Sequence, residues 1–132
     1  MNYNELIQSA IKAKKMAYAI YSNFSVGAAV LMEDGKIFNG CNVENASYGA
    51  TNCAERTAIF KAVSEGYKKI HAIAIIGSKD TYTFPCGICR QVIAEFSSSD
   101  TIIIIAKNEN DYIERTLEQI LPGAFTKDAL EK

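Results

Sequence analysis

The sequence contains no tryptophan, one histidine and two prolines, and it has no long hydrophobic run. Its longest aliphatic stretches, such as residues 102–106, are far shorter than the ~20 residues that a membrane-spanning helix needs. A charge excess is also missing, because 14 Lys and Arg residues are balanced by 15 Asp and Glu residues. Proteins that bind nucleic acid duplexes usually carry a basic excess. We therefore expect neither a nucleic acid nor a membrane as partner.

The N-terminus shows no export signal, since it carries Glu5 and no apolar core followed by a cleavage site. We therefore expect a cytoplasmic protein. At 132 residues, with 48% apolar and 22% charged residues, the chain has an ordinary globular composition. Disordered, collagenous and low-complexity classes are excluded. The length is that of one domain, which we expect to span residues 1–132.

Alternating helix and strand patterns predict an α/β protein with a mixed sheet. Apolar residues recur at helical spacing over 3–19 and predict the first helix. Strands at 26–32 and 36–42 flank an Asp-Gly hairpin signal. Further helices are predicted at 53–64, 85–96 and 116–121, and further strands at 70–76, at 101–106 and near Tyr112.

Four cysteines are present: Cys41, Cys53, Cys86 and Cys89. In a reducing compartment, free thiols, metal ligation or redox chemistry explain them better than disulfides do. Three interpretations are open. Cys86-x-x-Cys89 could be a redox pair, all four sulfurs could close a structural zinc site, or three could bind zinc and leave its fourth position open for chemistry.

Their positions favour a site with three sulfur ligands. Cys53 falls at one predicted helix start, and Cys86 and Cys89 fall at another, on one helix face. Helix N-termini carry partial positive charge and free N–H donors, which stabilise thiolates. Zinc suits sulfur ligands in a tetrahedron. Cys41 lies in a strand pattern, where we expect it to be a small buried hydrophobe.

Glu55, two residues after Cys53, has two interpretations. Within Asn52-x-x-Glu55 it fits a variant of the capping box, in which its carboxylate binds the N-cap amide. Beside a metal-bound water, whose pKa zinc lowers, the same carboxylate would move a proton. Cys53-Ala54-Glu55 together with Pro85-Cys86-Gly87-Ile88-Cys89 favours the second interpretation, because this combination is a signature of zinc deaminases.

On these residues the sequence resembles the small cytidine deaminases in which three cysteines hold zinc, and the resemblance runs over nearly the whole chain. Its specific stretches are 42–45, 52–58 and 85–91, with weaker matches at 21–28 and 121–125. It implies a three-layer α/β/α sandwich with a mixed five-stranded sheet. It also implies hydrolytic deamination of cytidine and deoxycytidine to uridine and deoxyuridine in pyrimidine salvage.

The resemblance implies roles for individual residues. Cys53, Cys86 and Cys89 would bind zinc, whose hydroxide would attack C4 of cytosine while Glu55 shuttles protons. Asn42 and Glu44 can point the same way on a strand and would bind the ribose hydroxyls. A site built on these bonds should reject the free base.

The other expected substrate contacts come from four further positions. Phe24 would lie against the pyrimidine, and we count Ala54 and Tyr48 among the substrate-binding residues. The resembled family forms homotetramers whose subunits complete one another's pockets. Phe125, near the C-terminus, is our candidate for such a reach into a neighbouring subunit.

Three thiolates exceed the charge of Zn²⁺ by one, so another group must offset the excess. Arg56 is our candidate, hydrogen-bonding to ligand sulfurs. We expect the loss of Arg56 to weaken zinc retention and turnover more than the loss of Arg90 does. Arg90 is equally well explained as a charge on the surface or at a subunit contact. His71 opens a strand outside both ligand helices, and we expect it to be structural or exposed.

Two positions depart from the family's usual pattern, namely Ile20, where proline is frequent, and Ile88, where alanine is common. Ile20 bears on how the first helix ends, and we expect Ile88 to alter the packing behind the metal. Two alternatives to a cytidine deaminase stay open beside the redox pair. One is a deaminase of another aminopyrimidine, such as a nucleoside antibiotic. The other is a binding module whose zinc takes Cys41 as its fourth ligand.

Overall fold

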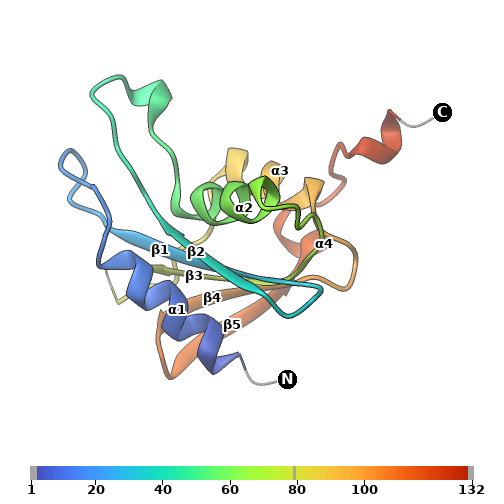
Figure 1. Ribbon diagram of the computed structural model, residues 1–132, viewed down its shortest axis with the longest axis horizontal. Coiled ribbons are helices and arrows are strands. Elements are labelled where there is room, and N and C mark those ends of the chain that lie inside the picture. Colours follow the sequence, from blue (N-terminus) through green and yellow to red (C-terminus); the bar gives the residue numbers. More distant parts are fainter. Residues whose placement is uncertain (1–2, 79, 131–132) are drawn as a thin grey trace.

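The computed structural model describes residues 3–78 and 80–130. Five strands form one mixed sheet in the order β2-β1-β3-β4-β5, with α1 on one face and α2 and α3 on the other (Figure 1). The predicted α/β sandwich with a mixed five-stranded sheet is therefore confirmed. In chain order the elements are α1 (Asn4–Lys14), β1 (Val26–Met32), β2 (Ile37–Cys41), η1 (Tyr48–Ala50), α2 (Ala54–Ser64), β3 (Ile70–Gly77), α3 (Gly87–Glu95), β4 (Ile102–Asn108), β5 (Asp111–Thr116), α4 (Leu117–Ile120) and η2 (Lys127–Ala129).

The strand directions decide which loops meet. β1 is antiparallel to both β2 and β3, β3 is parallel to β4, and β5 is antiparallel to β4. A parallel pair needs a crossover, and the chain between β3 and β4 supplies it with α3. Val26 at the start of β1 lies opposite Gly77 at the end of β3. The segment before β1 and the segment after β3 therefore leave the sheet at the same end of its strands.

The core lies on both faces of the sheet. Leu6, Ile7 and Ala10 of α1 cover one face, where small side chains of β1 and β3 let the helix approach closely. Ala58 and Ile59 of α2 belong to the core on the other face, together with residues of α3. β3 and β4 are buried nearly throughout, as expected for strands covered on both faces.

Two helix boundaries differ from those predicted from the sequence. α1 ends at Lys14 rather than at residue 19, because Tyr18 leaves the helix and forms backbone hydrogen bonds with Asn42 and Glu44. α3 begins at Gly87 with Cys86 as its N-cap, so the buried Pro85 precedes the helix instead of occupying its first turn. Within the described part of the chain, every helix is too short or too polar to span a membrane.

α1 passes over β1 at Gly27. A Cβ at this position would fall 2.0 Å from the Ala10 carbonyl oxygen and 2.7 Å from the Lys14 backbone nitrogen. Because both obstacles are backbone atoms, we predict that Gly27→Ala lowers the free energy of unfolding by about 1–3 kcal/mol, the range for overpacked sites. Urea denaturation followed by circular dichroism measures the change.

Gly49→Ala is the matched control, because a Cβ at residue 49 meets no atom within 4 Å. We expect it to change the free energy of unfolding by less than ~0.5 kcal/mol. Equal stability of the two variants would show that α1 does not depend on the bare backbone at Gly27.

Candidate active site

Three cysteine thiols meet where the N-termini of α2 and α3 converge. Cys53 is the N-cap of α2 and Cys86 the N-cap of α3, and Cys89 lies in the first turn of α3. The three Sγ atoms lie within 4.8 Å of one another, and those of Cys53 and Cys86 are 3.9 Å apart. Neither helix has a side-chain cap, so both turn free N–H groups and partial positive charge toward the sulfurs.

This cluster has the donor chemistry and spacing of a zinc site. With Zn–S bonds of about 2.3 Å, sulfurs at the corners of a tetrahedron lie about 3.8 Å apart. Cys86 is exposed, Cys53 half-buried and Cys89 buried, which leaves the cluster open on one side. Among the described residues Cys41 is not part of it, and Cys41 is half-buried rather than buried as expected. Among the described residues, a closed site with four sulfur ligands therefore lacks its fourth cysteine.

Arg56 contacts the cluster as expected from the sequence. Its Nη2 donates to Cys53 Sγ at 3.3 Å. Hydrogen bonds from the Cys89 thiol and from Arg56 lower the pKa of Cys53, whereas donation to Cys53 and burial raise the pKa of Cys89. Of these two thiols, Cys53 therefore loses its proton more readily.

Arg90 lies in a different environment from Arg56. Its Nε donates to the Pro85 carbonyl oxygen and its Nη1 to the Ile120 carbonyl oxygen, each at 2.7 Å. Arg90 therefore joins the start of α3 to the end of α4 and is not the free surface charge considered above. The sequence held no signal for this role, because both acceptors are backbone atoms placed by the tertiary structure.

Glu55 is buried beside the thiols, with only 4% of its surface exposed. Desolvation raises the pKa of its carboxyl group to about 7, and the nearby Cys53 acts in the same direction. The capping-box interpretation is wrong, because the N-cap is Cys53 and Asn52 instead donates to the Thr57 hydroxyl at 2.9 Å. A carboxyl with a pKa near neutrality can both accept and donate a proton.

A cavity of about 260 Å³ opens beside Glu55 and the thiols of Cys53 and Cys86. Four of the predicted substrate contacts line it, namely Phe24, Asn42, Glu44 and Ala54. Thr83 and Phe84 add a wall from the loop after β3 that sequence reasoning missed. The site is thus assembled from the chain before β1, the chain after β2, the loop after β3 and the starts of α2 and α3.

Two predicted contacts lie outside this cavity. Tyr48, 77% exposed, lines an adjoining cavity of about 380 Å³ that shares Glu44, Ser22 and Thr51 with the first. Phe125 is 63% exposed, and its carbonyl oxygen accepts a hydrogen bond from Gln91 at 2.7 Å. Phe125 is not among the residues that line the cavity of its own chain. The chain after α4 runs outward from the sheet (Figure 1).

Asn42 and Glu44 lie on one side of a segment held between two neighbours. Val43 exchanges backbone hydrogen bonds with Asn52, both 2.9 Å long, and forms a bridge with Tyr18. The two residues that flank Val43 therefore point the same way, as predicted. The segment also places Asn52, and hence Cys53, next to the strand that carries the two polar side chains.

Both polar side chains also hold the chain before β1 in place. The Asn42 amide accepts from the Val26 N–H and donates to the Phe24 carbonyl oxygen, each at 2.9 Å. The Glu44 carboxylate accepts from the Ser22 hydroxyl and from the N–H groups of Tyr21 and Ser22, and these bonds lower the pKa of Glu44. This positioning role was not predicted, because it joins residues far apart in the sequence.

Three other residues considered from the sequence, His71, Ile20 and Ile88, are exposed. His71 is exposed on β3, and Ile20 is exposed in the turns that follow α1. Ile88 is 63% exposed, so the expectation that it packs behind the metal site is wrong. It is the second residue of α3 and points outward, whereas Cys89 points to the cluster.

The comparisons with known proteins all indicate the same family. The model of the cytidine and deoxycytidylate deaminase zinc-binding region matches residues 1–105. Cytidine deaminases of Sporosarcina psychrophila and Halalkalibacterium halodurans are 48% and 50% identical to this chain, over 98% and 97% of it and 96% and 97% of their own lengths.

Solved structures agree with the sequence matches. The cytidine deaminase of Burkholderia pseudomallei is 46% identical and superimposes with a TM-score of 0.88, covering 95% of this chain and 100% of that one. The enzyme of Mycobacterium tuberculosis is 39% identical, with a TM-score of 0.84 over 95% of this chain and 98% of the other. Together with the converging thiols and the buried carboxyl, these matches show that the chain belongs to the cytidine deaminase family of hydrolytic enzymes.

Proposed function

We propose that this protein deaminates cytidine and deoxycytidine hydrolytically to uridine and deoxyuridine, with one Zn²⁺ held by Cys53, Cys86 and Cys89. The observation that carries the proposal is the buried Glu55 carboxyl beside three converging thiols in one cavity. The matched zinc-binding region and the names of the relatives support it.

The donor set suits zinc in its chemistry, and its surroundings offset its charge. Thiolate ligands favour soft or borderline cations, and the ligands must lose their protons when a metal binds. When bound, zinc supplies Lewis-acid activation of a water molecule near neutral pH. The N-termini of α2 and α3 and the Arg56 hydrogen bond to Cys53 offset the negative charge that three thiolates leave in excess.

Glu55 is the proton carrier of the proposed reaction. Its carboxylate accepts a proton from the attacking water, delivers it to N3 of the cytosine ring and then helps to protonate the leaving amine. The bond from C4 to the new oxygen forms and the bond from C4 to the amino nitrogen breaks. One water is consumed and one ammonia is released. A pKa raised to about 7 by burial suits a group that must hold and release a proton in one cycle.

Asn42, Glu44 and Phe24 are the groups that hold the nucleoside. The bonds from Asn42 to the backbone of Phe24 and Val26, and from Glu44 to residues 21 and 22, fix both side chains before substrate arrives. Their remaining donor and acceptor positions bind the ribose hydroxyls, and Phe24 packs against the pyrimidine. The described residues that line the cavity include no Lys or Arg, which favours an uncharged nucleoside over a phosphorylated one.

We also propose that the whole chain is one domain that works as a homotetramer. Large apolar side chains, including Met16, Ile20, Ile88 and Phe125, are exposed in the single chain, and exposed apolar surface marks interaction sites. Phe125, which lies outside the cavity of its own chain, would complete the pocket of a neighbouring copy. A monomer with full activity would contradict this arrangement.

The proposed reaction belongs to pyrimidine salvage, because it converts cytosine nucleosides into uracil nucleosides. The metal ligands would be three free thiols, which must stay reduced. Such a site favours a reducing compartment, and we therefore place the activity in the cytoplasm.

Glu55→Gln tests the proton carrier. The amide keeps the size of the side chain but cannot carry the proton, so we predict that turnover of cytidine falls by about 10²–10⁴-fold. The loss of absorbance as cytidine becomes uridine measures the rate. Zinc per chain, measured on the same samples, should equal that of the wild type. A near-wild-type rate with zinc in place would refute the role of Glu55.

Arg56→Ala tests how the excess charge is offset. We predict that loss of the hydrogen bond to Cys53 weakens zinc affinity about 10- to 100-fold and lowers turnover. Zinc retained after dialysis against a competing chelator measures the affinity. Arg90→Ala is the comparison, because Arg90 binds backbone carbonyls instead of sulfur. The folded fraction of Arg90→Ala should retain more zinc than Arg56→Ala does. Equal zinc retention in both variants would refute the role assigned to Arg56.

A further inference from the structure

One wall of the cavity comes from the loop that joins β3 to α3. Thr83 and Phe84 of this loop line the cavity, and Cys86 at its end belongs to the thiol cluster. The placement of this loop therefore bears on both the shape of the nucleoside pocket and the position of one metal ligand.

The end of the loop next to α3 is fixed by a strong contact. The Pro85 carbonyl oxygen accepts a hydrogen bond from Arg90 Nε at 2.7 Å, and Pro85 itself is buried. This contact holds the backbone immediately before Cys86. It does not by itself determine where Thr83 and Phe84 lie, because they precede it in the chain.

Thr83 packs tightly, but its side chain makes no hydrogen bond to the described residues. A Cβ at Gly77 would fall 2.2 Å from Thr83 Oγ1 and 2.7 Å from Phe24 Cζ, so both side chains rest on the bare backbone at the end of β3. The Thr83 hydroxyl is buried and has no hydrogen-bond partner within residues 3–78 and 80–130. Its position is therefore set by packing against the end of β3 and by its neighbours in the loop.

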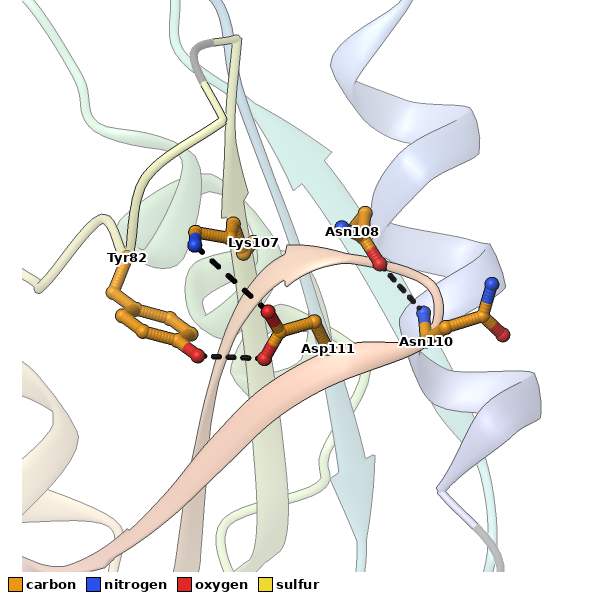
Figure 2. A network of polar contacts seen from close by, with 5 residues as sticks. All are labelled: Tyr82, Lys107, Asn108, Asn110 and Asp111. Carbon is orange, nitrogen blue, oxygen red and sulfur yellow. Dashed lines mark hydrogen bonds and ion pairs between the residues drawn. The ribbon is translucent and has the colours of Figure 1, made fainter.

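Tyr82, the residue before Thr83, is tied to the hairpin at the edge of the sheet (Figure 2). Its hydroxyl donates to Asp111 Oδ1 at 2.6 Å. Lys107 Nζ lies 3.9 Å from Asp111 Oδ2 and 5.2 Å from the centre of the Tyr82 ring, so one cation contacts both partners. Tyr82 and Asp111 do not line the cavity themselves.

The acceptor is well fixed because Asp111 is the first residue of β5. The turn before it is held by a hydrogen bond from the Asn110 N–H to Asn108 Oδ1 at 2.9 Å (Figure 2), and Asp111 is paired with Asn108 across the hairpin. A hydrogen bond to a charged group on such a hairpin anchors the side chain that donates it.

We propose that Tyr82 and Asp111 form a positioning pair that sets the cavity wall made by Thr83 and Phe84, and thereby the affinity for the nucleoside. The inference rests on the proposed deaminase function and assigns to that reaction two residues that touch no reacting atom. Without the pair, the loop occupies its binding-competent position for a smaller fraction of the time, and the apparent affinity falls by that fraction.

The test is a comparison of KM and kcat for cytidine in zinc-loaded variants. Tyr82→Phe removes only the hydroxyl, and we expect KM to rise about fivefold, the effect of losing one net hydrogen bond on a local equilibrium. We expect kcat to change by less than about twofold, because the pair does not act on the reacting atoms. Asp111→Ala should raise KM by at least as much, because it also removes the contact with Lys107. The double variant should be no worse than Asp111→Ala, which already removes the hydrogen bond from Tyr82.

Two further variants separate positioning from general stability. Asp111→Asn retains an oxygen acceptor for the Tyr82 hydroxyl, so its KM should lie closer to the wild-type value than that of Asp111→Ala. Tyr112→Phe is the matched control, because it removes a hydroxyl from the next residue of β5, whose side chain lies on the opposite face of the strand. Its KM should equal that of the wild type.

The outcomes distinguish this inference from the proposed function. A wild-type protein that holds zinc but does not convert cytidine overturns the proposed function and this inference with it. A wild-type protein that converts cytidine, with KM unchanged in Tyr82→Phe and Asp111→Ala, overturns the positioning pair alone. A fall in kcat or in zinc content at unchanged KM also overturns it, because the pair would then support the metal site instead of the pocket wall.

Discussion

The site depends on holding three sulfur atoms close to a carboxyl group that is buried, although one side of the cluster is open. Negative charges placed so close together repel one another, and burial penalises each of them. The N-termini of α2 and α3 oppose this repulsion from two directions, and Arg56 donates to Cys53 from a third. The pKa of Glu55 is raised mainly by burial, and the charge of the nearby Cys53 adds to the effect, so the cluster contributes to the proton chemistry of its neighbour.

The sheet makes this cluster into a pocket. Because β1 starts at the end of the sheet where β3 ends, the chain before β1 and the loop after β3 both contribute walls to the cavity. Asn42 and Glu44 hold the first wall through backbone hydrogen bonds, and we propose that Tyr82 and Asp111 hold the second. In this proposal each wall is stabilised by side chains on a neighbouring strand or strand extension, so contacts away from the reacting atoms contribute to the affinity for a nucleoside.

Local signals predicted most of the elements and the convergence of the thiols. Cys53, Cys86 and Cys89 stand at helix starts, and helix starts can be recognised from a few neighbouring residues. Features that depend on contacts between residues far apart in the sequence were not predicted. The early end of α1 depends on Tyr18 pairing with Asn42 and Glu44, and the role of Arg90 depends on the Ile120 carbonyl oxygen. Ile88 was misplaced because the sequence does not show which face of α3 lacks a neighbour.

The most direct measurement follows the fate of cytidine as zinc is removed and restored. The purified protein is incubated with cytidine, and uridine and ammonia are both quantified before chelation, after chelation and after one equivalent of Zn²⁺ has been returned. A thiolate-held zinc that serves hydrolytic deamination predicts equal amounts of uridine and ammonia, loss of both on chelation and recovery of both with zinc. Conversion that continues undiminished in the zinc-free protein, or a zinc-loaded protein that leaves cytidine unchanged, would contradict it.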